Sequence, residues 1–335
     1  MRAAVLRGGR MVADTLPDPV PAAGQALVKS LACGICGTDL HAMHDGPHMM
    51  AQFRRAGVGR PLDFARDIVL GHEFCCEILD YGPDTPQPFR RGTHVTAFPT
   101  GIGLSNTLSG GFGELMLLDV TRLEPVTNGL PPHLAALTEP MAVGVHAVAK
   151  ARLTQRDLPL VIGCGPVGLA VIAALKLQGA AGIVAADFSP ARRALAARMG
   201  ADVVVDPRMD TPYRHWHEIA DADRDALVFE CTGAAGVLQQ ILDGVPVNAR
   251  IVMAGACPVT DRFEPLVGTL KEVNIQFAVA YTAAEFSRTL HDLCEGRLDV
   301  SAMVTARVGT AGVARAMAEL SDPERQVKIV VEPWR

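Results

Sequence analysis

Apolar and polar residues follow two different patterns along the chain. Up to about residue 135, short runs rich in strand-forming residues, such as 68–79 and 93–99, alternate with Pro- and Gly-rich clusters at 17–24 and 82–92. Runs of this kind, bounded by such clusters, are typical of strands joined by turns. This part of the chain is therefore predicted to form a compact antiparallel β domain with long irregular loops.

From Leu158 onward the pattern changes to alternating strands and helices. Six short apolar runs are nearly continuous and rich in β-branched residues, which is typical of parallel strands buried on both faces of a sheet. Such strands, alternating with helices, predict a doubly wound α/β domain with a six-stranded parallel sheet. The predicted strands cover residues 159–162, 183–187, 202–205, 226–230, 250–254 and 273–279.

Capping residues mark the ends of several helices. Ser189 is a candidate N-cap, Pro190 takes the first helical position, and Gly200 follows the last turn. Thr282 and Glu285 fit a capping box at the start of a helix that ends near Gly296. Further elements are predicted over 234–242 (helix), from about 310 (helix) and over 326–331 (strand).

These elements suggest two domains, which is also what a chain of 335 residues favours. The α/β domain is predicted to cover residues 136–284. The β domain is predicted to cover 1–135 and, where the chain returns to it, 285–335.

Composition and charge exclude several classes of protein. The chain is 49% hydrophobic and 20% charged, which fits a globular protein rather than a disordered one. The net charge of −5 shows no basic excess for binding nucleic acid. The apolar segment 158–175 is interrupted by glycines and a proline, so it is interpreted as a strand, a turn and a buried helix rather than a membrane span. Eight cysteines and no apolar leader at the start predict reduced thiols and a cytoplasmic location.

A glycine-rich loop is the first candidate binding feature. Residues 163–168 read G-x-G-x-x-G between an apolar strand and a helix, and Asp187 lies 19 residues after the last glycine. This spacing is typical of dinucleotide binding, because the glycines admit a pyrophosphate and the acid accepts ribose hydroxyls. The acid favours NAD over NADP, although Arg192 and Arg193 could weaken that preference or simply form a solvated helix face. The candidate cofactor-binding residues are Gly163, Gly165, Pro166, Val167, Gly168, Asp187 and Arg192.

Three separated stretches, 34–41, 71–73 and 138–140, carry potential metal ligands. A thiolate, an imidazole and a carboxylate suit zinc, and three protein ligands with an open fourth position are typical of a catalytic rather than a structural site. Taken singly, each could instead be a buried thiol, a core histidine or a helix-start acid. The candidate ligands are Cys36, His72, Glu73 and Glu139.

In this order, GICGTDLH (34–41), GHE (71–73), GGFGEL (110–115), TEP (138–140) and the glycine loop resemble the zinc-dependent medium-chain alcohol dehydrogenases. The EP pair resembles the branch that contains sorbitol and threonine dehydrogenases. The resemblance covers essentially the whole chain. It implies a GroES-like β catalytic domain, a Rossmann domain that binds NAD, and one catalytic zinc ion per chain.

The resemblance also implies roles for single residues. Cys36 and His72 would be zinc ligands, and Glu73 and Glu139 would be the carboxylates at or near the metal, with the resemblance leaving open which of the two completes the zinc shell. Thr38 would take the proton of the alcohol and pass it toward His41. The implied reaction is hydride transfer from a secondary alcohol or polyol to NAD, giving a ketone or aldehyde.

The sequence departs from the family in two places. Many relatives hold a structural zinc with four closely spaced cysteines, but residues 99–110 contain none, so no structural zinc is expected. The stretch between Cys36 and His72 is longer than usual. Its apolar residues could border a substrate pocket and its arginines could meet an anionic group, or it could be a surface excursion. The residues concerned are Met43, Met49, Met50, Phe53, Arg54, Arg55 and Arg60.

Two other functions stay open at this point. A zinc-free quinone or enone reductase can share the fold but would not need the three candidate zinc ligands together. A catalytically silent NAD(H)-binding redox sensor would not lose anything if Cys36 were replaced. The expected partner is a small-molecule alcohol, without nucleic acid or membrane, and the strand near 273–281 is expected to pair with a second copy in a homodimer or homotetramer.

Overall fold

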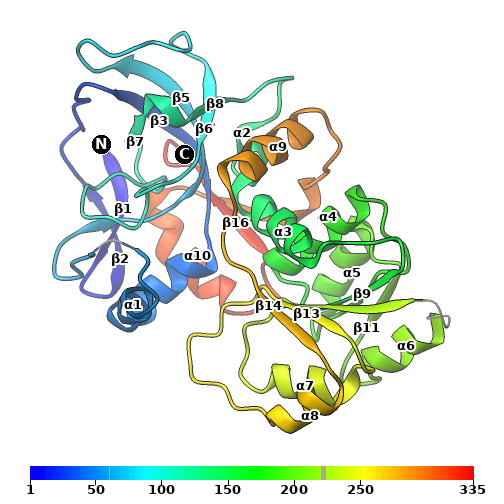
Figure 1. Ribbon diagram of the computed structural model, residues 1–335. Coiled ribbons are helices and arrows are strands. Elements are labelled where there is room, and N and C mark those ends of the chain that lie inside the picture. Colours follow the sequence, from blue (N-terminus) through cyan, green and yellow to red (C-terminus); the bar gives the residue numbers. More distant parts are fainter. Residues whose placement is uncertain (60, 220–223) are drawn as a thin grey trace. The chain divides into compact units, whose positions relative to one another are not determined.

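The computed structural model describes residues 1–59, 61–219 and 224–335, and the chain divides into two compact units (Figure 1). The first unit comprises Met1–Glu139, Leu290–Gly296 and Val304–Arg335. The second comprises Pro140–Thr289 and Arg297–Met303. The predicted combination of an antiparallel β domain and a doubly wound parallel sheet is confirmed.

The first unit is built on two sheets. One has the strand order β2-β1-β4, and the other has the order β15-β16-β3-β5-β6-β8 with β7 also pairing with β3. Its strands are β1 (Arg2–Arg7), β2 (Arg10–Thr15), β3 (Gln25–Gly34), β4 (Ile68–Val69), β5 (Glu73–Tyr81), β6 (His94–Ala97), β7 (Leu115–Asp119), β8 (Leu123–Pro125), β15 (Val304–Val308) and β16 (Lys328–Val331). Its helices are α1 (Gly37–Arg55), α2 (Pro132–Ala135) and α10 (Val313–Leu320).

The pairing of β3 with β5 determines where the chemistry of this unit lies. Alternate residues of β3 are fully buried, which is the period-two pattern of a strand with one face on a core. The antiparallel register runs from Ala26 opposite Tyr81 to Gly34 opposite Glu73. The last residue of β3 is thus the neighbour of the first residue of β5, and both adjoin the turns that carry candidate metal ligands.

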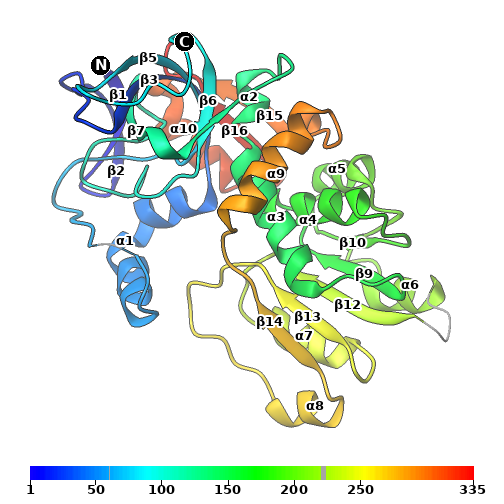
Figure 2. The same ribbon diagram turned by 45° about the horizontal axis from the view of Figure 1, so that its top comes forward.

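The second unit is a six-stranded parallel sheet in the order β11-β10-β9-β12-β13-β14. Helices α4 and α5 lie on one face of this sheet and α7 and α8 on the other (Figures 1 and 2). Its strands are β9 (Asp157–Ile162), β10 (Val184–Ala186), β11 (Val203–Val205), β12 (Asp225–Glu230), β13 (Arg250–Met253) and β14 (Asn274–Phe277). Its helices are α3 (Thr138–Ala151, which begins in the first unit), α4 (Pro166–Leu177), α5 (Pro190–Met199), α6 (Pro212–Ile219), α7 (Val237–Gly244), α8 (Pro265–Leu270) and α9 (Ala283–Cys294, which ends in the first unit).

Local signals in the second unit act as expected. The Ser189 side chain accepts a hydrogen bond from the backbone N–H of Arg192, and Gly200 closes α5 in the left-handed region at φ 117°. The apolar segment 158–175 is divided between β9 and α4, with the glycine turn between them. Among the described residues, no helix is both long and apolar enough to cross a membrane.

The stretch after Cys36 differs most from the sequence-based expectation. A loop was expected there, but residues 37–55 form α1, which projects from the sheets of the first unit (Figure 2). The helix contains Pro47 and is kinked at Asp45, whose φ is −151°. Gly46 and Pro47 have low helix propensity, and for this reason a loop rather than a helix was expected here. The buried side chains of Ala42 and Met49 on the core compensate for that cost.

Candidate functional site

Cys36, His72 and Glu73 come together at one end of the β3–β5 pair in the first unit. Cys36 lies between the end of β3 and the start of α1, while His72 and Glu73 follow the turn after β4. One possible ligand atom from each lies within 4.8 Å of the other two. A thiolate, an imidazole and a carboxylate at this spacing fit a zinc ion, because all three can point to one centre.

Asp39 faces the histidine of this group. Its Oδ2 accepts a hydrogen bond from the backbone N–H of Cys36 at 2.9 Å, and its Oδ1 lies 3.6 Å from His72 Nδ1. Both Asp39 Oδ1 and His72 Nδ1 are buried, and neither has a hydrogen-bond partner among the described residues. A carboxylate facing one ring nitrogen leaves the other, Nε2, to serve as the ligand atom.

The His72 ring lies in a negative electrostatic environment created by Cys36 and Asp39. Burial alone lowers the pKa of His72, but the charges of Cys36 and Asp39 outweigh burial and raise the pKa well above 6.5. A site that draws a proton onto a buried imidazole also favours a bound cation. The donor set and its charge both fit zinc.

Glu73 has a second interaction that the sequence analysis missed. Its two carboxylate oxygens accept hydrogen bonds from Lys328 Nζ at 2.7 and 2.8 Å, and Lys328 also donates to the carbonyl oxygen of Ile35 at 3.0 Å. Both side chains of the pair are buried. Burial lowers the pKa of Lys328, but the neighbouring negative groups, led by Glu73 and including Cys36 and Glu139, together outweigh burial and raise this pKa. A lysine at the head of the apolar strand β16 was the signal that could have pointed to this pair.

Gly34 makes room for the Glu73 carboxylate. A Cβ atom on Gly34 would lie 2.0 Å from Glu73 Oε2, which is far inside van der Waals contact. The absence of a side chain on β3 therefore lets the carboxylate of the neighbouring strand turn toward both Cys36 and Lys328.

Glu139 occupies a different position from Glu73. It lies in the first turn of α3 and is half-buried. Its charge contributes to the raised pKa of Lys328, so the two side chains interact electrostatically. Among the described residues, the group that could hold a metal comprises Cys36, His72 and Glu73 and does not include Glu139. The geometry therefore ranks Glu73 ahead of Glu139 as a candidate ligand.

Thr38 and His41 lie on the first turns of α1. Thr38 Oγ1 is 3.6 Å from Cys36 Sγ and is half-buried, so its hydroxyl lies at the edge of the candidate metal group. His41 follows three residues later and is exposed. Residues three apart share one face of a helix. Thr38 thus lies beside the candidate metal group, and His41, on the same helix face, is in contact with solvent.

A cavity of about 440 Å³ adjoins His72. Apolar side chains of α1 and of the segment after β6 form much of its wall, and Met50 and Phe53 are among them. Arg54 lines a neighbouring cavity of about 480 Å³, Arg55 is exposed, and Arg60 lies outside the described residues. The residues around the first cavity are Met50, Phe53, Gly59, His72, Pro99, Thr100, Gly101, Ile102 and Leu104.

Part of that wall comes from the stretch 99–110, which has no cysteine. It rests directly on the turn that bears His72. The backbone of Gly103 packs so closely on Gly71 that a Cβ on Gly103 would lie 2.8 Å from the Gly71 carbonyl carbon. A hydrogen bond from the Gly103 N–H to the Ser109 carbonyl, 2.9 Å long, closes the loop. Backbone contacts thus hold this segment in place.

In the second unit the glycine loop has the shape that a dinucleotide requires. Gly163 has φ 93°, and a Cβ on Gly168 would lie 1.8 Å from the Gly163 carbonyl oxygen, so both positions exclude side chains. A Cβ on Gly165 would meet nothing closer than Arg192 Nη1, at 3.7 Å. The first and third glycines thus form the turn and pack α4 on it, and the second leaves an open face for a pyrophosphate. Pro166 and Val167 begin α4, whose N-terminus attracts anions.

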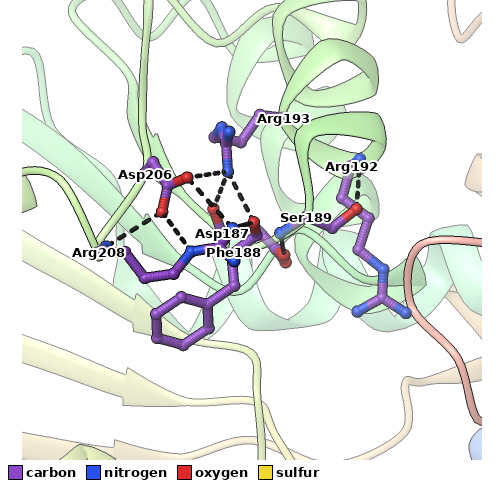
Figure 3. A network of polar contacts seen from close by, with 7 residues as sticks. All are labelled: Asp187, Phe188, Ser189, Arg192, Arg193, Asp206 and Arg208. Carbon is purple, nitrogen blue, oxygen red and sulfur yellow. Dashed lines mark hydrogen bonds and ion pairs between the residues drawn. The ribbon is translucent and has the colours of Figure 1, made fainter.

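Asp187 lies at the carboxyl end of β10, beside this loop. Its Oδ2 accepts a hydrogen bond from the Cys164 N–H at 2.7 Å, and its Oδ1 accepts one from the Ser189 N–H at 2.8 Å. These bonds hold the carboxylate next to the loop, where it can accept further hydrogen bonds from ribose hydroxyls. Figure 3 shows Arg193 turned toward Asp206, and Arg192 pointing away from both acids.

Two family models match the chain. The alcohol dehydrogenase GroES-like domain matches residues 22–128, and the zinc-binding dehydrogenase model matches residues 166–295. The chain belongs to the zinc-type medium-chain dehydrogenases. It is an oxidoreductase of a family that uses zinc and NAD(P).

Within that family, the chain is similar to dehydrogenases of small alcohols. It is 27% identical over 346 residues to the (R,R)-butanediol dehydrogenase of Neisseria gonorrhoeae, covering 96% of each chain. The crystal structure of 2R,3R-butanediol dehydrogenase from Bacillus subtilis superposes with a TM-score of 0.85 at 28% identity, covering 99% of each chain. A zinc-binding dehydrogenase from Sinorhizobium meliloti bound to NADP shares the fold with a TM-score of 0.83 at 23% identity, again covering 99% of each chain.

Proposed function

We propose that this protein oxidises a secondary alcohol or polyol to a ketone or aldehyde, with zinc and NAD as cofactors. The observation that carries the proposal is the group of Cys36, His72 and Glu73, which opens onto a cavity in the same unit. When bound, zinc supplies a Lewis acid that lowers the pKa of an alcohol hydroxyl, and NAD supplies the hydride acceptor.

The chain's own residues divide the remaining work. Cys36 and His72 would hold the metal with Glu73, and Asp39 would fix the His72 ring. The hydroxyl of Thr38 lies beside Cys36 and would accept the alcohol proton. The exposed imidazole of His41 is suited to pass that proton to solvent, since its ordinary pKa lies near neutrality.

The lining of the cavity favours one kind of substrate within this class. Met50, Phe53, Ile102 and Leu104 are all apolar, and no charged side chain other than His72 borders the cavity among the described residues. A wall of this kind stabilises an alkyl substituent but leaves the hydroxyls of a long polyol without partners. The expected substrate is therefore a secondary alcohol or short diol with an apolar end.

A spectrophotometric screen for NADH formation tests the function. Alcohols, diols and polyols of increasing length are offered with NAD and with NADP, before and after zinc is removed with a chelator. We expect turnover that disappears with the metal and returns when zinc is restored. Full activity in metal-free protein would favour the zinc-free reductase and overturn the proposal.

A pair of cysteine variants separates the enzyme from a silent redox sensor. Cys36→Ser should abolish turnover and lower bound zinc, while NADH binding in the second unit persists. Cys257→Ser is the matched control, because its thiol donates to the Val259 carbonyl within the second unit, away from the candidate zinc ligands. Unchanged turnover in Cys36→Ser would contradict the proposed role of the metal group.

We further propose a cytoplasmic homodimer or homotetramer. All eight cysteines are free thiols, which suits a reducing compartment. The edge strand β14 and the preceding α8 present exposed apolar side chains at Leu266, Leu270 and Phe277, with Val279 just beyond. An apolar sheet edge of this kind favours pairing with a second copy. Light scattering should give a multiple of the 35.5 kDa chain mass; a monomer would contradict this part of the proposal.

A further inference from the structure

Two acidic side chains stand next to one another at the carboxyl edge of the parallel sheet in the second unit. The register of β10 and β11 pairs Ala186 with Val205, and Asp187 and Asp206 are the residues that follow this pair. The Asp187 N–H also donates to the Val205 carbonyl at 3.3 Å. Asp187 is the predicted ribose-binding acid, whereas Asp206 was not among the candidate cofactor-binding residues.

Asp206 holds two arginines that surround the ribose-binding edge. Its Oδ2 lies 3.1 Å from Arg193 Nη1, and its Oδ1 accepts from Arg208 Nε, also at 3.1 Å. Arg193 Nη1 additionally donates to the carbonyl oxygens of Asp187 and Phe188, each at 2.8 Å. Arg208 stacks over the ring of Phe188 at 5.7 Å from its centroid (Figure 3). Both guanidinium groups are thereby directed toward Asp206.

Arg192 is arranged differently from these two. Its guanidinium lies by Gly165, on the face left open for the pyrophosphate, and its Nε is buried without a hydrogen-bond partner. Figure 3 shows it directed away from Asp206. Arg193 and Arg208 both donate to the Phe188 carbonyl, next to Asp187, so they are the arginines that could meet a phosphate on the 2′-hydroxyl of the ribose.

The chemistry of the two cofactors gives this arrangement a consequence. NADP differs from NAD by a phosphate on the 2′-hydroxyl, which a nearby arginine accommodates and an acid repels. Arginine binds phosphate through two parallel N–H···O bonds, but only when its fork is not already occupied. Here Asp206 binds Nε and Nη2 of Arg208 and engages Nη1 of Arg193, and it adds a second negative charge beside Asp187.

We propose that Asp206 is a second determinant of NAD selectivity. It acts as a positioning residue that withdraws Arg193 and Arg208 from a 2′-phosphate. The inference rests on the proposed function only in that this edge binds a nicotinamide dinucleotide. Asp187 alone, with both arginines released, would discriminate much less between the two cofactors.

Binding measurements on Asp206→Asn test the proposal. Dissociation constants are measured for NADH and NADPH from the fluorescence of the reduced nicotinamide. Adenosine 5′-diphosphate and adenosine 2′,5′-bisphosphate report the adenosine end alone by calorimetry. We expect Asp206→Asn to bind NADPH and the bisphosphate at least about tenfold more tightly, with NADH binding changed by less than about threefold. The gain should shrink as salt is added.

Two further variants distinguish released arginines from a simple change of charge. Adding Arg208→Gln to Asp206→Asn should remove much of the gain in NADPH binding. Asp243→Asn is the matched control, since it removes the same charge at the end of α7, where the carboxylate bonds to Gln239. It should leave the preference unchanged. An equal gain in this control, or no gain in Asp206→Asn, overturns the inference.

A third variant covers the case in which Asp206→Asn does not fold. Asp187→Ser keeps Asp206 and should lose NADH affinity without gaining NADPH affinity. A strong gain for NADPH in that variant would show that the arginines are already available and would overturn the inference. If the unaltered protein binds neither dinucleotide, the proposed function fails instead, so the two failures are distinct.

Discussion

Lys328 Nζ lies 2.7 and 2.8 Å from the two carboxylate oxygens of Glu73, and neither side chain reaches solvent. The two residues are 255 positions apart in the sequence. The pair places a positive charge directly behind a candidate zinc ligand. The charge of Glu73 is thus balanced by the protein before any metal binds.

Lys328→Met should destabilise the metal-free protein by about 3–5 kcal/mol, because it leaves a buried carboxylate without a partner. Urea denaturation of the chelator-treated protein measures this loss. Combining Lys328→Met with Glu73→Gln removes the unpaired charge, so the double variant should recover most of the stability. A loss in the double variant as large as in Lys328→Met would show that packing, rather than charge, is responsible.

Asp39→Asn should weaken zinc binding by about 10- to 100-fold, because the His72 ring loses the carboxylate that orients it. Competition with a coloured chelator measures the affinity. The exposed His41 provides a control on the same helix, since His41→Ala removes an imidazole that does not belong to the metal group. Its zinc affinity should stay within about threefold of the original. Equal affinities for both variants would contradict the orienting role of Asp39.

Leu104→Asn should reduce kcat/KM for secondary alcohols with long alkyl ends by about tenfold or more, because a polar group would line the apolar cavity. The value for a short diol should change much less, since a short diol does not extend along that wall. Steady-state kinetics with a series of chain lengths gives the comparison. Val58→Asn, at an exposed position outside this cavity, is the control. A uniform loss for all substrates would indicate a disturbed fold rather than a lost contact.

The pH dependence of stability should include a contribution from Glu285. Burial raises the pKa of this carboxyl, but hydrogen bonds from the Thr282 N–H and from His146 outweigh burial and lower the pKa below 4.5. A carboxyl whose pKa is lowered by folding stabilises the native state above its unfolded pKa, and this stabilisation disappears as pH falls through its folded pKa. Glu285→Gln should therefore lower the thermal midpoint at pH 7, with a difference that shrinks below about pH 4.5.

The exposed Glu324 is the comparison residue for this measurement. Glu324→Gln should leave the midpoint unchanged at every pH. A difference between Glu285→Gln and the original protein that stays constant from pH 7 down to pH 3 would contradict the assignment.

Much of the fold was predictable because its signals are local. The capping residues of α5, the glycine turn before α4 and the β-branched strands all depend on neighbours within a few residues. The kinked helix α1 was not predicted because Gly46 and Pro47 have low helix propensity. Packing of the helix on the core stabilises it, and such packing is not visible in the local sequence.

The candidate site shows the same division. The ligand types at Cys36, His72 and Glu73 were recognisable from short motifs. Lys328 was not, because its partner is brought to it only by the pairing of β16 with β3 and of β3 with β5. The role argued for Asp206 likewise depends on the register of β10 and β11, which no local pattern in the sequence specifies.

The contact between Gly103 and Gly71 bears on how this enzyme can be re-engineered. Because the segment 99–110 is held by backbone contacts and not by a cluster of thiolates, its outer residues can be exchanged without disturbing a metal cluster. Transplanted loops that retain Gly103, in a protein that retains Gly71, should still pack beside His72. Libraries of variants confined to the segment 99–110 are thus a direct route to altered substrate range.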